Sequence, residues 1–217
     1  MADVTFQKST LREYFESILV AVVLALFVRT FVFQAFKIPT GSMKPNLLVG
    51  DHLIVNKFIF APTVTALERM LLPMRPIERG DIVVFKFPDE AERDFIKRVI
   101  GLPGDTLELK NQTVFINGQP LTESYAHYIF PPADEGQYDA MAPRRKYGPI
   151  TVPEGHYFMM GDNRDDSQDS RFWEHTFLPQ SYVKGRALFI YWSFDVPDDG
   201  SAGGFAPRWG RLFHQIH

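Results

Sequence analysis

Residues Ile38–Asp51 read IPTGSMKPNLLVGD and divide the chain into two unlike parts. A long apolar run ends just before this stretch, and short segments of alternating polarity follow it. A glycine in the stretch separates two hydroxyl residues, Thr40 and Ser42, and Pro39 and Pro45 flank them. Because glycine frees the backbone and proline restricts it, we expect Ser42 on a constrained, partly exposed bend, which suits a nucleophile.

An ordinary turn is the alternative interpretation of Thr-Gly-Ser between prolines. The spacing also differs from the G-x-S-x-G motif of hydrolases, because Lys44 stands where that motif has its second glycine. A catalytic Ser42 would therefore need a base from elsewhere in the chain.

The length allows one good-sized core or a core plus a small subdomain, and the composition excludes several kinds of function. The chain has 217 residues, of which 45% are apolar, and a net charge of -3. Neither this charge nor any sequence motif points to a nucleic-acid partner. The absence of cysteine excludes disulfides, thiolate chemistry and cysteine-bound zinc.

The apolar run before the serine stretch predicts a membrane anchor. Ile18–Val28 is uninterrupted, and its flanks extend it to 22 residues, 15–36, close to the roughly 20 that span a bilayer. Arg29 lies near one end, where its side chain can reach the headgroups. We therefore expect a tail at 1–14, a transmembrane helix at 15–36 and one domain at 37–217. A cleaved signal peptide is the alternative, although no A-x-A site follows the segment.

The charges beside this segment leave its orientation open. Lys8 and Arg12 precede it, whereas Arg29, Lys37 and Lys44 follow it. The positive-inside rule therefore favours neither orientation clearly.

Short β-strands are predicted throughout the rest of the chain. The runs 52–60, 82–87, 156–160 and 187–194 are rich in β-branched and aromatic residues. Residues 106–122 predict a hairpin that joins LELK to TVFI, with Asn117-Gly118 as its turn signal. A short helix is expected within 61–76, while 123–147 shows no period and is interpreted as a small insertion.

The stretch Asp94–Asp105, DFIKRVIGLPGD, carries two cations in an apolar strand. Strand alternation places Lys97 on one face with Phe95 and Val99, and Arg98 on the other, so we expect one of the two cations to point inward. A buried lysine loses solvation, which lowers its pKa and makes it a candidate general base. Alternatively, both cations are edge-strand charges that oppose aggregation.

The loop after the strand at 156–160 is acidic but lacks the ligand pattern of a calcium site. Arg164 stands where an EF-hand beginning at Asp162 needs an oxygen ligand. Arg164 and Arg171 instead suggest internal ion pairs that make the loop rigid. A solvated acidic loop is the alternative.

The apolar span and four motifs after it, in this order, resemble the bacterial type I signal peptidase, or leader peptidase, family. The apolar span and IPTGSMKPNLLVGD are followed by GDIVVFKFP at 80–88, DFIKRVIGLPGD at 94–105 and GDNRDDSQDSRFW at 161–173. The resemblance implies a mainly β fold, an antiparallel sheet or barrel-like catalytic domain preceded by one N-terminal transmembrane helix. It implies a membrane-bound serine endopeptidase without metal or other cofactor.

The same resemblance assigns roles to individual residues. Ser42 matches the nucleophile and Lys97 the general base of a Ser-Lys dyad. The N–H of Ser42 and the hydroxyl of Thr40, where the family more commonly has serine, match the oxyanion hole. Ser167 matches the residue that orients the lysine, and Asp169 and Arg171 match a supporting ion pair. The substrate pockets fall on Phe36, Ile38, Val84 and Ile96, with Pro39, Met43, Leu47 and Phe95 lining the inner pocket. These small, apolar pockets would select Ala-x-Ala before the cut.

The implied setting is the bacterial inner (plasma) membrane. The single span would leave the N-terminus cytoplasmic and the catalytic domain on the outer, periplasmic side, although Gram-negative members often have two spans. Its expected partners are secreted preproteins, the lipid bilayer and, transiently, the export translocon. The C-terminal aromatics Trp192, Phe194, Phe205, Trp209 and Phe213 would either seat the domain on the bilayer or belong to the core.

Three other classes of protein remain as alternatives. A self-cleaving repressor with a Ser-Lys site would carry a DNA-binding domain, which this sequence lacks. A membrane-anchored binding module would not explain the coincidence of Ser42, Lys97 and Ser167. A Ser-His-Asp hydrolase could use one of four histidines outside any recognised triad motif, namely His52, His127, His156 or His175.

Overall fold

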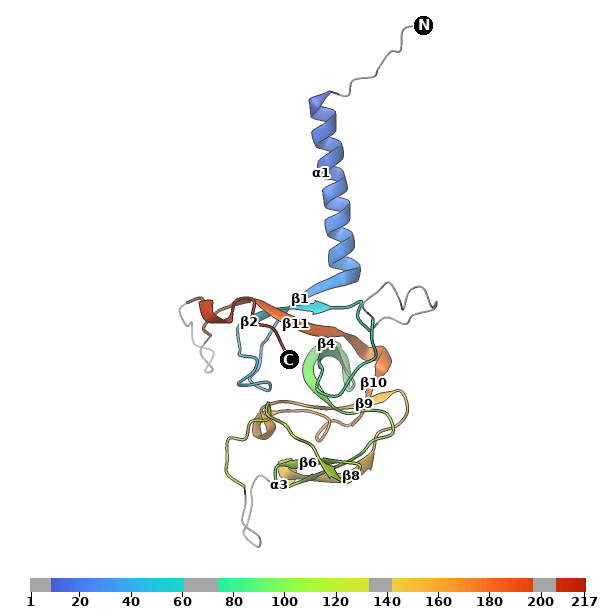
Figure 1. Ribbon diagram of the computed structural model, residues 1–217, viewed down its shortest axis with the longest axis vertical. Helices are drawn as coiled ribbons and strands as arrows, with labels where there is room; N and C mark the ends of the chain where they lie inside the picture. The colour runs from blue at the N-terminus through green and yellow to red at the C-terminus, as the bar shows by residue number, and fades with distance from the viewer. Residues whose placement is uncertain (1–8, 61–73, 133–141, 197–205) are drawn as a thin grey trace.

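The computed structural model describes residues 9–60, 74–132, 142–196 and 206–217. Its N-terminal segment is α1, Thr10–Phe27, continued by a π-helical turn at Val28–Val32. Figure 1 shows this helix projecting away from a body of strands. The helix is long and apolar enough to cross a membrane, and none of it is buried in the protein.

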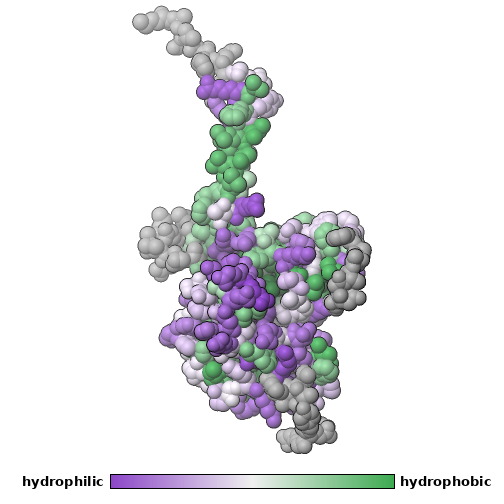
Figure 2. Space-filling view, turned by 180° about the vertical axis from the view of Figure 1, so that it is seen from behind, coloured by the Kyte–Doolittle hydropathy of each residue, from purple (hydrophilic) through white to green (hydrophobic). Residues whose placement is uncertain are grey.

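The position of this helix corrects the predicted boundaries of the span. It begins at Thr10 rather than at residue 15 and ends at Val32. Residues 33–36 belong instead to strand β1, Phe33–Lys37, which pairs with β2, Asp51–Asn56. Figure 2 shows a continuous hydrophobic band along the helix, with hydrophilic residues at the end nearer the N-terminus. The strand formers Phe33 and Phe36 join the sheet because β2 supplies backbone partners there.

The body is a seven-stranded antiparallel sheet in the order β1-β2-β11-β3-β4-β9-β10. Its remaining strands are β3, Ile82–Phe87, β4, Glu90–Gly101, β9, His156–Met160, β10, Leu178–Pro179, and β11, Val183–Ser193. The predicted runs at 82–87 and 156–160 match β3 and β9, and the mainly β, antiparallel fold is confirmed. One edge strand, β1, leads directly from the helix into the serine stretch.

A second, four-stranded sheet has the order β7-β6-β5-β8. It contains β5, Thr106–Lys110, β6, Thr113–Ile116, β7, Gln119–Pro120, and β8, Lys146–Thr151. LELK and TVFI do form a hairpin, but its turn is Asn111-Gln112, and both of these residues have positive φ. The predicted turn, Asn117-Gly118, joins β6 to β7 instead.

The remaining elements are short. They are α3, Ala142–Arg145, and four turns of helix at Arg164–Asp166, Gln180–Tyr182, Trp209–Arg211 and the π-turn above. The last two residues of the segment 123–147, which is interpreted as an insertion, belong to β8. The helix expected within 61–76 lies largely at residues 61–73, outside the described residues.

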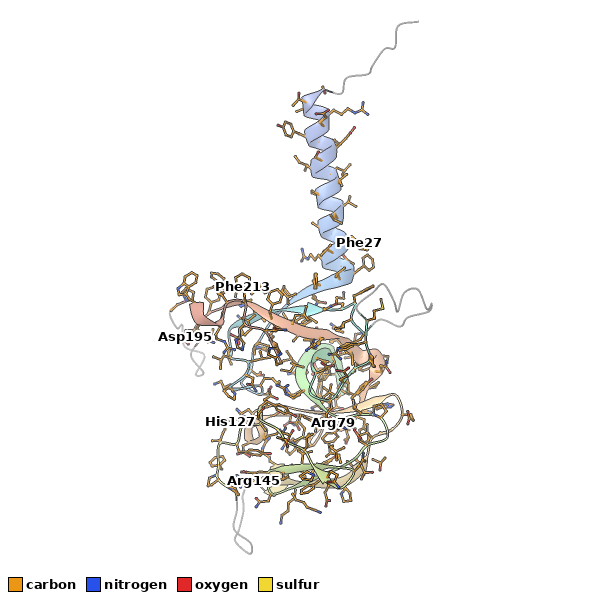
Figure 3. The ribbon with its side chains drawn as sticks, viewed as in Figure 1. Phe27, Arg79, His127, Arg145, Asp195 and Phe213 are labelled. Atoms are coloured by element: carbon orange, nitrogen blue, oxygen red, sulfur yellow. The ribbon has the colours of Figure 1, made fainter. Side chains whose placement is uncertain are left out.

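The C-terminal aromatics lie mostly outside the core. Trp209 is 66% exposed and Phe213 77% exposed, whereas Trp192 and Phe194 are half-buried. Figure 3 places Phe213 on the side of the sheet from which the helix emerges. Phe205 lies outside the described residues. The core interpretation is therefore wrong for Trp209 and Phe213.

Candidate active site

Ser42 and Lys97 meet at the centre of the candidate site. Lys97 Nζ donates a hydrogen bond of 2.7 Å to Ser42 Oγ and another of 3.0 Å to the carbonyl oxygen of Ile96. Both side chains are buried, and Lys97 is only 4% exposed. Ser42 lies in the turn after β1, and Lys97 lies in β4, so two separate elements bring the pair together.

Burial sets the charge state of Lys97. The loss of solvation lowers its pKa from 10.5 to about 8, although Asp169 and Asp162 oppose this change by favouring the ammonium. The Phe95 ring lies on the same face of β4, with its centroid 5.3 Å from Lys97 Nζ. A substantial fraction of Lys97 is therefore neutral near pH 8, as a general base requires.

Arg98 corrects the expectation that only one of the two cations points inward. It is 2% exposed, and its guanidinium binds both carboxylate oxygens of Asp162, at 2.8 and 2.7 Å. It also donates to the carbonyl oxygens of Gly80 and His217. Both faces of β4 are buried here, so alternation alone could not choose between the two cations.

Thr40 lies beside the nucleophile. Its Oγ1 is 3.5 Å from Ser42 Oγ, and the residue is exposed. The structure therefore places the Thr40 hydroxyl next to the hydroxyl of Ser42.

The acidic loop is held by ion pairs, as the interspersed arginines suggest. Asp169 and Arg171 form a fully buried pair at 2.8 Å, and Asp169 also accepts from Gly161 N–H. Burial alone would raise the pKa of Asp169, but the charge and hydrogen bonds of Arg171 outweigh it and lower the pKa. Asp169 is therefore an anion that orders the loop.

Ser167 does not contact Lys97 through a hydrogen bond. Its Oγ is buried, and the hydrogen bonds of Lys97 Nζ go to Ser42 and Ile96 instead. Ser167 nevertheless lies close to Gly161, where an added Cβ would collide with Ser167 Oγ and with the carbonyl oxygen of Ser42. Glycine at 161 thus lets the loop approach the nucleophile closely.

The predicted pocket residues divide into a surface layer and a buried layer. Pro39, Phe95 and Ile96 line an open cleft of about 700 Å³ that also contains Ser42 and Lys97. Ile96 also belongs to a buried hydrophobic cluster that includes most of the others, namely Ile38, Met43, Leu47 and Val84, with Phe36 packed against it. These other members support the cleft rather than line it.

Sequence reasoning missed part of this cleft. Phe87, Arg93, Asp94, Asp166 and Gln168 also line it. The alternation of β4 could have identified Arg93, because residues 93, 95 and 97 share a face. Phe87 gives no such local signal, since it reaches the cleft by stacking on Phe95 at 4.3 Å.

The segment 123–130, which sequence reasoning left unassigned, supports the acidic loop from behind. Glu123 pairs with the buried Arg164, and His127 exchanges backbone hydrogen bonds with both neighbours of Asn163. The carboxylate of Asp165 accepts the N–H groups of residues 129 and 130. These contacts cross 35 or more positions of sequence, so no short motif marks them.

The histidines do not complete a triad with Ser42. Three of them direct Nδ1 elsewhere: His52 to the Gly50 carbonyl, His156 to that of Glu154, and His175 to Asp89. Ser42 Oγ instead has Lys97 and Thr40 as its neighbours. The geometry therefore favours the lysine as base.

Comparison with known proteins identifies the family. The family model described as signal peptidase, peptidase S26, matches residues 11–192. The chain belongs to this family. Signal peptidase I of Pseudomonas aeruginosa is 33% identical to it, over 89% of this chain and 77% of that protein. Signal peptidase I of Leptolyngbya laminosa is 39% identical, over 85% and 81%.

A solved signal peptidase I from Enterococcus faecalis is 34% identical, with a TM-score of 0.41 over 52% of this chain and 97% of that one. The family assignment therefore rests on the sequence relatives. Membership of the signal peptidase family makes the chain an enzyme, a peptidase that processes exported preproteins, and its apolar N-terminal helix makes it membrane-anchored.

Proposed function

We propose that this enzyme removes N-terminal signal peptides after Ala-x-Ala by a Ser42–Lys97 dyad, through an acyl-enzyme. The observation that carries the proposal is the 2.7 Å contact between Lys97 Nζ and Ser42 Oγ, made by a lysine whose pKa is about 8. A serine hydroxyl is a weak nucleophile by itself, and an adjacent neutral amine activates it.

The reaction follows from these positions. Neutral Lys97 takes the Ser42 proton as Ser42 Oγ bonds to the scissile carbonyl carbon, and the carbonyl oxygen becomes an oxyanion. The N–H of Ser42 and the hydroxyl of Thr40 stabilise this charge. Protonated Lys97 then gives its proton to the departing amine as the C–N bond breaks. Water activated by the same lysine hydrolyses the acyl-enzyme and restores Ser42.

The cleft supports selection of small residues. Its wall beside Ser42 is formed by Pro39, Phe95 and Ile96, above a closely packed cluster that includes Met43 and Leu47. Because this cluster is fully buried, it leaves little freedom to accommodate a large side chain. We infer that alanine fits one and three positions before the cut.

The acidic loop has two roles in this proposal. The pair Asp169–Arg171 fixes the loop, and Ser167 orients the lysine in its protonated form by turning its buried hydroxyl toward Nζ. The ammonium has one more N–H than the amine, so the protonated lysine needs an additional acceptor.

The helix defines the placement that we propose for the enzyme. It crosses the bacterial inner membrane once, with the N-terminus in the cytoplasm and the catalytic domain on the periplasmic side. The exposed Trp209 and Phe213 then meet the lipid headgroups, where aromatic residues are enriched. Preproteins emerging from the export translocon would reach the cleft at this surface, through transient contact with the translocon.

Cleavage of a preprotein with an Ala-x-Ala site tests this function. We expect the wild type to cut it, and folded Ser42→Ala and Lys97→Ala variants not to. A substrate with phenylalanine in place of the final alanine should resist the wild type. Cleavage by folded Ser42→Ala would remove Ser42 as nucleophile, and loss of activity on replacement of one of the histidines would favour a histidine-based hydrolase.

A further inference from the structure

Asn163 holds the nucleophile's bend at two adjacent carbonyl groups. Its backbone N–H donates to the carbonyl oxygen of Ser42 at 3.1 Å, and its side-chain Nδ2 donates to that of Gly41 at 3.3 Å. Asn163 is 4% exposed, so water competes little for these contacts. The residue does not touch Ser42 Oγ or Lys97 Nζ through a hydrogen bond, and any effect on the reaction must pass through the backbone.

The second contact fixes the direction of a donor group. The carbonyl of Gly41 and the N–H of Ser42 belong to one peptide unit, which is planar and trans here, so the two groups point in opposite directions. Gly41 O also accepts the N–H of Lys44 at 3.0 Å, so the Asn163 amide is the second of two donors that hold this carbonyl on one side and direct the Ser42 N–H to the other. A hydrogen bond at the carbonyl also polarises the peptide and strengthens the N–H as a donor.

Asn163 is itself held rigidly. His127 accepts from Arg164 N–H at 2.8 Å and donates to Asp162 O at 2.7 Å, so both neighbours of Asn163 are fixed. The side chain of Asp162 is bound by Arg98, and that of Arg164 by Glu123. A donor that is fixed before the reaction needs no reorganisation when charge develops.

The side-chain amide of Asn163 uses its donor but not its acceptor. Only Nδ2 can face Gly41 O, since two acceptors would repel, and this leaves Oδ1 buried with no hydrogen-bond partner among the described residues. A buried acceptor without a partner is destabilising. The amide therefore holds the peptide between Gly41 and Ser42, and its unpaired Oδ1 lowers the stability of the fold somewhat.

We propose that Asn163 is a positioning residue for the oxyanion hole, acting through the peptide between Gly41 and Ser42. This inference rests on the proposed function, because it assumes attack by Ser42 and stabilisation of the oxyanion by the Ser42 N–H. It adds a group that neither bears the charge nor moves the proton but sets the direction of a donor.

The decisive variant is Asn163→Leu, which has a similar volume but no polar atoms. With full-length enzyme in detergent and an Ala-x-Ala preprotein, kcat should fall by about 10- to 100-fold, less than the roughly 10²- to 10³-fold loss for a deleted donor. KM and the pH midpoint of the Lys97 limb should stay unchanged. The midpoint of urea unfolding should not fall, because the unpaired acceptor is also removed.

Two further variants keep the test clear. Asn163→Ala removes the amide without adding a leucine that could disturb the loop, and it should show the same loss in kcat. Asn117→Ala is the matched control, since the Asn117 side chain accepts from Thr106 N–H and donates to Asp105, but Asn117 lies in the turn between β6 and β7 of the four-stranded sheet. It should lower stability and leave kcat unchanged.

An unchanged kcat in folded Asn163→Leu and Asn163→Ala would overturn the proposal. So would a loss of kcat that appears only together with lower stability and a shifted pH midpoint, since that indicates a purely structural role. If the wild type does not cut the preprotein at all, the proposed function fails and this inference fails with it. Cleavage by the wild type with unaffected Asn163 variants rejects the positioning role alone.

Discussion

The two faces of strand β4 give two adjacent buried cations very different hydrogen-bond partners. On one face, Arg98 is held by both oxygens of Asp162 and by two backbone carbonyls. On the other, Lys97 has a hydroxyl and one carbonyl as its hydrogen-bond partners. Burial is nearly complete on both faces, so depth does not separate the two cations. The guanidinium keeps its charge and has a carboxylate partner to balance it, whereas the amine of Lys97 can lose its proton.

Replacing the base by a permanent cation gives the largest expected effect. Lys97→Arg keeps the charge but removes the neutral form, because guanidinium does not deprotonate in proteins. We expect kcat/KM for preprotein cleavage to fall at least about 10⁴-fold, as for loss of a triad member. Lys110→Arg, an exposed lysine of the four-stranded sheet, is the control and should cleave normally. Substantial activity in Lys97→Arg would show that the lysine is not the base.

Removing the paired cation should damage the fold instead. Arg98→Met leaves Asp162 charged, buried and without its main partner, and the free energy of unfolding should fall by about 3–5 kcal/mol. Adding Asp162→Leu should recover most of this loss, because no isolated charge then remains. Urea unfolding in detergent measures both. A change below about 1 kcal/mol would mean that the Arg98–Asp162 pair contributes no more than an ordinary surface ion pair.

The hydroxyl beside Ser42 tests the catalytic face without disturbing the fold. Thr40→Ala removes one oxyanion donor and should raise the barrier by about 2.7–4 kcal/mol, seen as a lower kcat. Thr40→Ser keeps the hydroxyl and should retain activity. Since Thr40 is exposed, the unfolding midpoint should not change in either variant. Normal cleavage by Thr40→Ala would mean that another donor fills the hole.

The last and smallest effect has the opposite sign to that of Arg98. The folded-state pKa of Lys97, about 8, lies below the ordinary lysine value of 10.5, so the unfolded chain binds more protons between these values. Lys97 thus reduces stability below about pH 8, and the reduction disappears as pH rises to about 10.5. Lys97→Met should gain up to about 3 kcal/mol at pH 7 and nothing above pH 10.5. An equal gain in stability of Lys97→Met over the wild type at both pH values would contradict the lowered pKa.

The sequence predicted those features that depend on local pattern. Enrichment in β-branched and aromatic residues identified β3 and β9, and the desolvated Phe95–Lys97–Val99 face identified a lysine with a lowered pKa. The family resemblance, rather than periodicity, connected this lysine to Ser42. The interspersed arginines suggested internal ion pairs in the acidic loop, and the family resemblance named the pair Asp169–Arg171.

Features that depend on distant partners were missed or misplaced. The inward position of Arg98 depends on Asp162, which lies 64 positions away. The strong Asn117-Gly118 signal was correct as a turn but was assigned to the wrong pair of strands, because Asn111-Gln112 adopts positive φ as well. The helix was extended over residues 33–36, because hydropathy does not distinguish an apolar edge strand from a span.

The pH dependence of kcat/KM for preprotein cleavage tests the central claim most directly. If the buried Lys97 is the base, the rate should rise along one limb with an apparent pKa of about 8 and then level off. The limb should disappear together with activity in Lys97→Ala. A limb near 10.5, as for a solvated lysine, or a rate independent of pH between 6 and 10, which we take as the approximate range of the assay, would contradict the account.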